Sequence, residues 1–247
     1  MKIGKFGLIN NFLPYYLIEK NGRYEVVESS PRELSEMLLR GDIVYAPVPS
    51  YFYIKKKDVL DRHSFCVSSD GEVFSVVVVS RRKRLDDSPI AVTSKSMTSS
   101  KMMEIIKKER GMINRLVTVD GDFMEVLRDF DHALVIGDEA IKARMVFRVV
   151  MDMGEEWKEI TGLPAVFGIA TSRKGFEQGK AIDSDVIDSY RKGMEMKDEI
   201  VEIASLKFRM PAEFLSVYFS RLVHEAGGKE IKSLEVFEEL VNEHGLH

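Results

Sequence analysis

Polar side chains that could bind an anion or assist a reaction come directly after several apolar, strand-like runs of this sequence. Asn11 follows the first run, Ser50 follows a later one, and Ser69 ends a third, with Ser75 shortly beyond it. In α/β proteins, ligands bind at the carboxyl ends of strands, against helix N-termini with free N–H groups. The pattern favours a ligand site built from strand ends, although Asn11 ahead of Pro14 also fits the cap of an ordinary first helix.

The densest group of hydroxyls lies in residues 93–100, where six of the eight residues are Ser or Thr. These residues follow a short strand and precede or begin a helix predicted at 97–108. Hydroxyls and backbone N–H groups at a helix N-terminus suit a carboxylate or a phosphate. Capping alone needs only one or two hydroxyls, so Ser96, Thr98 and Ser99 are candidate substrate-binding residues.

Asp138, in the turn after the apolar run 133–136, is the carboxylate that this pattern singles out. It is a candidate substrate-binding residue, and the competing interpretation is a helix N-cap. The strand ends otherwise offer neutral hydrogen-bonding groups, and none of them is an obvious general base.

The composition excludes several classes of protein. The chain has 247 residues, 45% hydrophobic and 31% charged, and its formal net charge is −4. It therefore has no global basic field for nucleic acid. The single Cys66, expected as a buried thiol, excludes an intrachain disulfide, and the five scattered histidines contain no i, i+4 metal pair. We expect no metal, no cofactor and no nucleic-acid partner.

Two further observations concern location. No apolar run approaches the length needed to span a bilayer. The first residues lead straight into a strand, which is not the pattern of a signal peptide. We therefore expect a soluble, cytoplasmic protein without a membrane span.

Strand-like runs alternate with helical segments, which predicts an α/β fold with mainly parallel sheets. Ser30-Pro31 followed by Glu33 is typical of a helix start. The four valines at 76–79 predict a strand buried on both faces. Strands are expected at 2–9, 24–28, 42–48, 73–79, 90–93, 116–119, 133–136, 146–150 and 165–170, and helices at 11–18, 32–40, 97–108, 123–128, 184–208, 211–224 and 233–242.

The short strands are too many for one compact sheet, so we expect two lobes. Lobe 1 comprises residues 1–85 and 165–247 and includes the C-terminal helices, and lobe 2 is the inserted segment 86–164. Two chain crossings make a hinge, and a cleft between lobes is a common ligand site. Trp157, the only tryptophan, is expected to pack in a core.

Several short segments, in this order and at this spacing, are together typical of one family. On these segments the chain resembles the two-lobed, periplasmic-binding-protein-like enzymes of the futalosine route to menaquinone, and among them the chorismate dehydratases. It departs from their pattern at Glu72, where proline is usual, at Gly168-Ile169 and at Asn10. The segments are Gly4–Phe6 with Asn11–Pro14, Gly41–Ile43 with Pro47-Val48, Ser68–Gly71 with Val73 and Ser75-Val76, Ile90–Thr93 with Ser96–Ser99, Ile136–Ala140, Glu156-Trp157 with Thr161–Pro164, and Tyr218-Phe219.

The resemblance implies a type II periplasmic-binding-protein-like fold with a ligand cleft between its lobes. It also implies an enzyme, a carbon-oxygen hydro-lyase that removes water from chorismate to give 3-[(1-carboxyvinyl)oxy]benzoate in menaquinone biosynthesis. The implied partner is this small dicarboxylate substrate. The sequence does not decide between a monomer and a homodimer paired through the C-terminal helices.

The same resemblance implies roles for the candidate residues. Asn11 would be catalytic and would hydrogen-bond at the reacting centre. The hydroxyls at the start of the 97–108 helix would hold one carboxylate, and those of the third strand end would hold the other or orient the ring. The implied substrate-binding set is Ser50, Ser69, Ser75, Ser96, Thr98, Ser99 and Asp138.

Three alternatives stay open at this point. A sister lyase that acts on cyclic dehypoxanthine futalosine would need a larger pocket and usually a histidine near the site, and none of the strand-end turns contains one. A non-catalytic carboxylate-binding protein of the same fold would be expected to carry an export signal. A transcription-factor effector lobe would need an attached DNA-binding segment.

Overall fold

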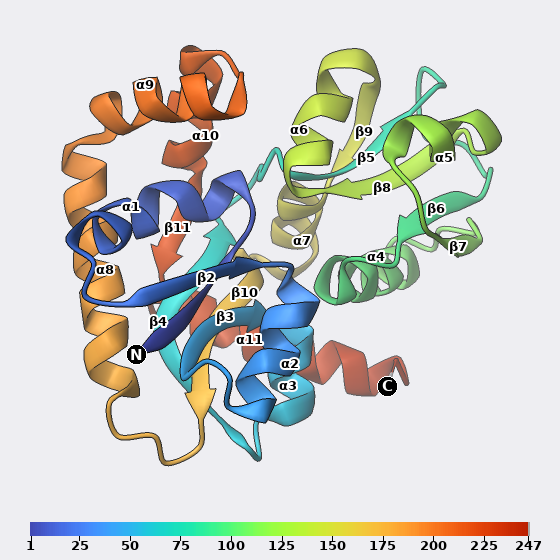
Figure 1. The fold of residues 1–247 in the computed structure, drawn as a ribbon. Helices are drawn as coiled ribbons and strands as arrows, with labels where there is room; N and C mark the ends of the chain where they lie inside the picture. Colours follow the sequence, from blue (N-terminus) through green and yellow to red (C-terminus); the bar gives the residue numbers. More distant parts are fainter. Residues whose placement is uncertain (247) are drawn as a thin grey trace. The chain divides into compact units, whose positions relative to one another are not determined.

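A computed structural model describes residues 1–246, which form two compact units. Unit 1 comprises Met1–Ser68 and Val166–Gly227, and unit 2 comprises Ser69–Ala165 and Gly228–His247. Each unit contains a sheet flanked by helices, as Figure 1 shows for the separate units. The expected α/β class with two sheets is therefore confirmed.

The sheet of unit 1 has six strands in the order β11-β4-β10-β3-β1-β2. β1 pairs in parallel with both β2 and β3, whereas β10 runs antiparallel to β3. The sheet is thus mixed, with a parallel βαβ core at one side. The strands are β1 (Lys2–Phe6), β2 (Glu25–Ser29), β3 (Tyr45–Pro49), β4 (Leu60–Ser69), β10 (Ala165–Arg173) and β11 (Leu222–Glu225).

Helix α2 of unit 1 begins where the sequence predicts. Ser30 is its N-cap and accepts a hydrogen bond from the backbone N of Glu33 at 3.2 Å, and Pro31 occupies the first helical position. The Glu33 carboxylate binds the hydroxyl of Ser29. The helical elements are η1 (Ile9–Asn11), α1 (Phe12–Asn21), α2 (Pro31–Arg40), α3 (Ser50–Lys56), α8 (Gly179–Glu195), α9 (Lys197–Phe208) and α10 (Ala212–Arg221).

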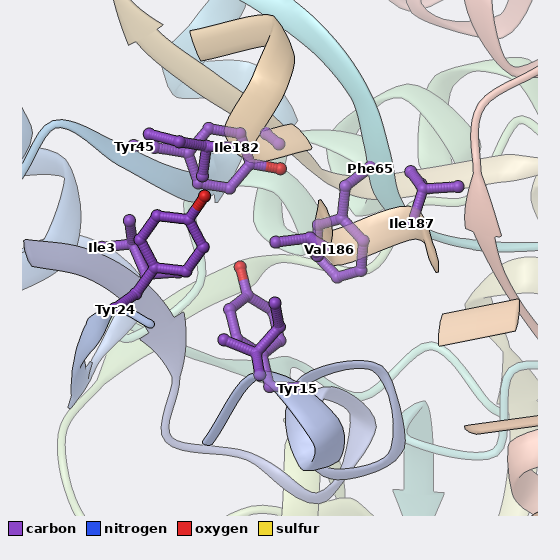
Figure 2. Packing of buried hydrophobic residues seen from close by; sticks show 10 residues of the cluster. Ile3, Tyr15, Tyr24, Tyr45, Phe65, Ile182, Val186 and Ile187 are labelled. Carbon is purple, nitrogen blue, oxygen red and sulfur yellow. The ribbon is translucent and has the colours of Figure 1, made fainter. Parts of the chain in front are cut away.

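The core of unit 1 contains a buried carboxylate among aromatic rings. Tyr15, Tyr45 and Phe65 pack with aliphatic side chains of β1 and α8 (Figure 2). Asp183 of α8 accepts hydrogen bonds from the Tyr45 hydroxyl at 2.6 Å and from the backbone N of Ser64 and Phe65 at 2.8 and 3.0 Å. These three donors satisfy the charge and tie α8 to β3 and β4.

The sheet of unit 2 has five strands in the order β7-β6-β8-β5-β9. β6 is parallel to β7 and β8, and β5 is antiparallel to β8 and β9. All four valines of the run 76–79 are buried, as predicted. The strands are β5 (Val76–Ser80), β6 (Ile90–Thr93), β7 (Leu116–Val119), β8 (His132–Ile136) and β9 (Arg148–Asp152).

The first boundary between the units lies at 68/69 and not at the expected 85/86, whereas the second, at 165/166, lies one residue from the expected 164/165. β5 lies in unit 2 because it pairs on both sides with strands of that unit. A continuous apolar run predicts burial on both faces but does not say which sheet receives the strand. The helices of unit 2 are α4 (Met97–Glu109), α5 (Phe123–Asp129), α6 (Gly137–Val146), α7 (Met153–Thr161) and α11 (Gly228–Glu243).

The C-terminal helix α11 also belongs to unit 2 and not, as expected, to the first lobe. Trp157 of α7 is buried, donates from Nε1 to the Ser233 hydroxyl at 2.9 Å, and packs edge-on against Phe237. The expected packing role of Trp157 is thus confirmed, and this side chain is the anchor that attaches α11.

Arg81 and Arg82, which begin the basic run at 81–84, have structural partners in unit 2. Nη1 of Arg81 donates to the carbonyls of Leu127 and Arg128 at the end of α5, and Arg82 pairs with Asp131 at 2.8 Å. None of the helices formed by residues 1–246 has the length and apolar character to cross a bilayer.

The buried His224 makes the stability of unit 1 depend on pH. Its ring stacks on Phe65, and its Nδ1 lies 2.8 Å from the carbonyl oxygen of Cys66, so the neutral ring carries its proton on Nδ1. Burial lowers the pKa of His224 from 6.5 to about 4. The unfolded chain therefore binds a proton in this window that the folded chain excludes, and acid favours unfolding.

We expect the free energy of unfolding to fall by about 3 kcal/mol through this group as the pH drops from about 6.5 to about 4. His224→Phe keeps an aromatic ring but removes the titrating group. Compared with wild type, the free energy of unfolding of this variant should be lower at pH 7 and should change less with pH. Urea unfolding of both proteins at several pH values measures this. Identical pH slopes for the two proteins would contradict the assignment.

Candidate functional site

The predicted residues of unit 1 follow neighbouring parallel strands. Asn11 comes five residues after β1, and Ser50 comes directly after β3. Because β1 and β3 are parallel neighbours, their carboxyl ends lie at the same edge of the sheet. The structure thus places these two candidates at the edge where the sequence predicts them.

Asn11 stands at the N-cap position of α1 but does not cap that helix with its side chain. Its Oδ1 accepts from the backbone N of Phe6 at 3.2 Å, and its Nδ2 donates to Oδ1 of Asn10 at 3.0 Å. Asn11 is fully buried, whereas Asn10 is 8% exposed. These bonds use one of the two amide N–H groups of Asn11 and fix the orientation of its side chain.

Ser50 is also fully buried. It begins α3, and its hydroxyl donates to the carbonyl oxygen of Val166 at 2.7 Å. The hydroxyl proton therefore ties α3 to β10, and an additional contact of this side chain would use an oxygen lone pair.

The predicted residues of unit 2 gather at one edge of its sheet. The register pairs Val76, at the start of β5, with Ile136, at the end of β8. The ends of β6 and β8 point the same way because these strands are parallel. Ser75, the turn after β6 and the turn after β8 therefore share this edge, and the Gly137 backbone N donates to the Ser75 carbonyl at 2.6 Å.

Ser69 and Ser75 flank a tight loop. The Ser69 hydroxyl donates to the carbonyl of Gly71 at 3.0 Å, and the backbone N of Ser75 donates to the carbonyl of Val73 at 2.8 Å. Both serines are buried. Between them, Phe74 has φ = 65°, a left-handed conformation that is uncommon for residues other than glycine.

The hydroxyl-rich segment before and within α4 is partly used for its own structure. Ser96 caps α4 by accepting from the backbone N of Ser99 at 3.2 Å, and the Ser100 hydroxyl donates to the carbonyl of Ser96 at 2.6 Å. The Ser94 hydroxyl binds Asp120. Thr98 lies with Ser99 in the first turn, and both are 3% exposed. Local bonds thus account for several of the hydroxyls that the sequence assigned to an anion.

Asp138 lies in the first turn of α6 and is half-buried. The N-cap of that helix is Ile136, so the competing interpretation of Asp138 as the N-cap is wrong. A carboxylate in the first turn is still favourable because it faces the positive end of the helix dipole.

Asp152 is a residue of this edge that the sequence analysis missed. It caps α7 by accepting from the backbone N of Gly154 and Glu155, and it also accepts from the backbone N of Val73 and Phe74. Burial raises the pKa of this carboxyl, and the four N–H bonds oppose that rise. Its position at the end of a strand and three residues before Glu155 is a capping signal, but no local pattern reveals the contact with the loop.

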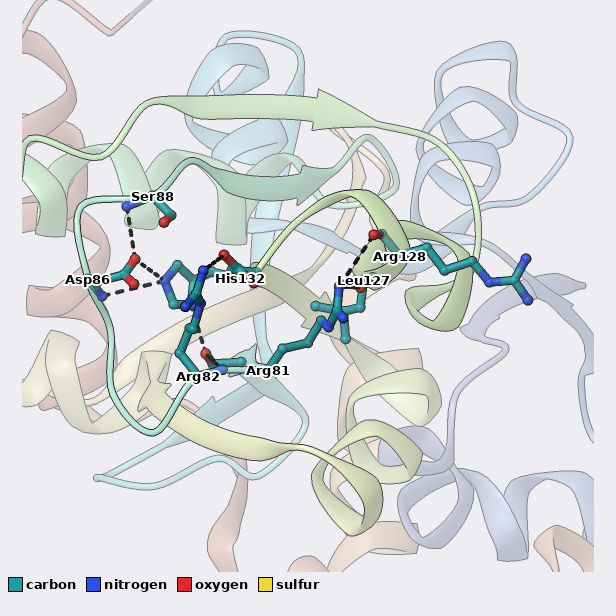
Figure 3. Close-up of polar contacts among 9 residues, drawn as sticks. Arg81, Arg82, Asp86, Ser88, Leu127, Arg128 and His132 are labelled. Atoms are coloured by element: carbon teal, nitrogen blue, oxygen red, sulfur yellow. Dashed lines mark hydrogen bonds and ion pairs between the residues drawn. The ribbon is translucent and has the colours of Figure 1, made fainter.

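Among residues 1–246, no group of three or more His, Cys, Asp and Glu side chains is arranged to hold a metal ion. A set of Ser80, His132 and Asp86 does occur elsewhere in unit 2, and Figure 3 labels its His132 and Asp86. Nδ1 of His132 lies 2.9 Å from the Ser80 hydroxyl, and its Nε2 lies 2.8 Å from Oδ1 of Asp86. Ser80 is 2% exposed and His132 is fully buried, so a substrate cannot reach them and the set links strands to a loop.

Solved structures share this fold. Protein AF1704 from Archaeoglobus fulgidus is similar over 100% of this chain and 98% of its own, with a TM-score of 0.81 and 17% identity. The periplasmic aliphatic sulphonate binding protein SsuA from Escherichia coli is similar over 100% of this chain and 87% of its own, with a TM-score of 0.69 and 13% identity. The fold is therefore that of periplasmic binding proteins, as expected.

The sequence defines the family within this fold. A family model described as menaquinone biosynthesis matches residues 1–243, and the chain belongs to this menaquinone biosynthesis family. Chorismate dehydratase from Thermus thermophilus is 29% identical over 210 residues, which are 78% of this chain and 77% of the relative. The resemblance inferred from the short segments is confirmed.

The link between Asp86 and His132 predicts a pH-dependent contribution to stability. Hydrogen bonds from His132 and Ser88 hold the pKa of Asp86 well below its usual range. Such a carboxylate stabilises the fold above its unfolded-state pKa of about 4, and this contribution disappears in stronger acid. We expect Asp86→Asn to lower the melting temperature at pH 7 and the difference from wild type to shrink below about pH 4.

Thermal unfolding of Asp86→Asn, followed by circular dichroism between pH 3 and pH 7, checks this expectation. Asp87→Asn removes the same charge one residue further along and is the matched control. If both variants lose equal stability at pH 7, the hydrogen bond to His132 has no particular role.

Proposed function

We propose that this protein is a chorismate dehydratase, a hydro-lyase that converts chorismate into 3-[(1-carboxyvinyl)oxy]benzoate. The observation that carries the proposal is the similarity to the Thermus thermophilus chorismate dehydratase over 210 residues, together with membership of the menaquinone biosynthesis family. That similarity covers 78% of the chain and therefore includes parts of both units.

The side chains at the strand ends support this choice of reaction. The reaction removes the proton from the ring carbon that carries the ether and hydroxide from the neighbouring carbon, and the ring becomes aromatic. Because aromatisation supplies the driving force, the protein mainly has to orient the dianion and assist the two departures. Amides, hydroxyls and helix N-termini can do this without a strong base.

In this proposal Asn11 hydrogen-bonds at the reacting centre, and its two bonds to Phe6 and Asn10 preset its orientation. The first turn of α4 binds one substrate carboxylate through Ser96, Thr98 and Ser99, with support from the helix dipole. The remaining proposed contacts to the second carboxylate and the ring are made by Ser50, Ser69, Ser75 and Asp138. A carboxylate of the substrate itself accepts the proton.

The first test is turnover. Purified protein mixed with chorismate should form a product that has lost one water, detected by liquid chromatography and mass spectrometry. If no product forms but another dicarboxylate raises the melting temperature, the protein is a binding protein of the same fold and the proposal is wrong.

Two substitutions test the assigned roles. Asn11→Ala should abolish turnover, a loss of at least about 100-fold, because the oriented amide is gone. Asp138→Asn should leave a folded protein with partial activity, because an amide can replace a contact that does not transfer a proton. Full loss in Asp138→Asn with activity retained in Asn11→Ala would reverse the assignment.

Asn114→Ala is the matched control for Asn11→Ala. Asn114 is also a buried amide, and it binds the backbone carbonyls of Asp86 and Ser88 at 2.6 and 2.7 Å. Its loss should lower stability by about 1–3 kcal/mol and leave turnover intact. Equal loss of activity in both variants would show that Asn11 acts only through the fold.

A further inference from the structure

We propose that Asp152 is a positioning residue for the reaction: its buried carboxylate holds the loop 70–75 in the conformation that presents Ser69 and Ser75. This inference rests on the proposed function, because that function gives the two serines their role. The observation behind it is a set of four hydrogen bonds to Asp152, two of which join it to a loop about eighty residues earlier in the chain.

The bonds divide into two sets. Two of them cap α7: Oδ1 accepts from the backbone N of Gly154 at 3.0 Å and of Glu155 at 3.4 Å. The other two clamp the loop: Oδ1 accepts from the backbone N of Val73 at 3.0 Å, and Oδ2 accepts from that of Phe74 at 2.9 Å. Asp152 is only 6% exposed, so water does not compete for these donors.

The two loop bonds of Asp152 hold a backbone conformation that is unfavourable for a residue other than glycine. Phe74, whose backbone N is bound by Asp152, has φ = 65°, and backbone strain of this kind persists only when the surrounding structure imposes it. The next residue is Ser75, and its carbonyl accepts from the backbone N of Gly137 at 2.6 Å. Fixing Phe74 therefore fixes Ser75 against the start of α6.

The other end of the loop lies against α7, the helix that Asp152 caps. A Cβ atom added to Gly154 would lie 2.2 Å from the carbonyl oxygen of Gly71 and 2.6 Å from the hydroxyl oxygen of Ser69. Only glycine permits this close approach. Asp152 and Gly154 together thus hold both ends of the loop: Ser69 lies against the start of α7, and Ser75, next to the bound Phe74, lies against the start of α6.

Asp152 itself is poorly suited to be the proton acceptor. Both of its oxygens already accept hydrogen bonds, and a carboxylate that stabilises four N–H groups loses those bonds in part when it is protonated. Its effect on the reaction would therefore pass through the loop, which distinguishes a positioning residue from one that touches the substrate.

Asp152→Ser separates the cap from the clamp. Serine is as good an N-cap as aspartate, so α7 keeps its cap, but one hydroxyl oxygen cannot also bind the two loop donors. Asp122→Ser is the matched control: Asp122 caps α5 in the same unit, accepting from the backbone N of Met124 and Glu125 at 2.8 and 3.0 Å.

Two measurements are made on both variants and on wild type. The first is amide hydrogen exchange at Val73 and Phe74, which needs no substrate. We expect exchange to become at least about 10-fold faster in Asp152→Ser and to stay unchanged in Asp122→Ser. Unchanged exchange in Asp152→Ser would overturn the clamp, whether or not the protein turns over chorismate.

The second measurement is chorismate turnover. We expect Asp152→Ser to lose about 100-fold in kcat/KM, mostly in kcat, and Asp122→Ser to match wild type. Adding Ser75→Ala to Asp152→Ser should cost little more, because the misplaced serine no longer contributes. Faster exchange with normal kcat/KM, or fully additive losses, would overturn the positioning role while the dehydratase proposal stands. A wild type that does not turn over chorismate would instead remove the proposed function and with it the positioning role, whereas the exchange data would still decide whether the clamp exists.

Discussion

A carboxylate that leaves water must be surrounded by hydrogen-bond donors, and both units are organised around this requirement. In unit 1, Asp183 draws together a tyrosine hydroxyl of β3 and two backbone N–H groups of β4. In unit 2, Asp152 draws together the start of α7 and the loop before β5. Removing the donors would leave a buried charge unpaired, so each aspartate makes distant segments of the chain dependent on one another.

The strand-end geometry follows from parallel pairing. In each sheet three adjacent strands run parallel, β2-β1-β3 in unit 1 and β7-β6-β8 in unit 2. Parallel neighbours end at one edge, and the helices that follow them begin there. Polar residues that are separate in sequence, such as Ser96 and Asp138, are thus brought to a common edge by the sheet alone, before any specific side-chain contact forms.

The sequence predicted what depends on local pattern. Ser30 with Pro31 marks the start of α2, and the valine run marks β5, because caps and apolar runs are local signals. The sequence analysis placed β5 and α11 in lobe 1, and the structure places both in unit 2. β5 belongs there because it pairs with β8 and β9, and α11 belongs there because it packs on Trp157. For the site, the sequence likewise predicts position but not contacts. The places of Asn11 and Ser75 near strand ends follow from local pattern. The hydrogen bond from the Phe6 backbone N to Asn11, and those from the loop to Asp152, are tertiary contacts that no local pattern predicts.

The reactions that the strand-end residues can assist depend on which of their polar groups are already engaged in hydrogen bonds within the protein. Asp152 is occupied by backbone donors, and the hydroxyl of Ser50 is held by a carbonyl. Apart from the Asp138 carboxylate, the remaining candidate groups are amides, hydroxyls and helix N-termini, which orient a substrate and stabilise negative charge but accept protons poorly. Such a set suits a reaction whose driving force resides in the substrate. The proposed dehydration therefore depends on how rigidly these turns are held, and a strained loop fixed by a buried carboxylate provides that rigidity.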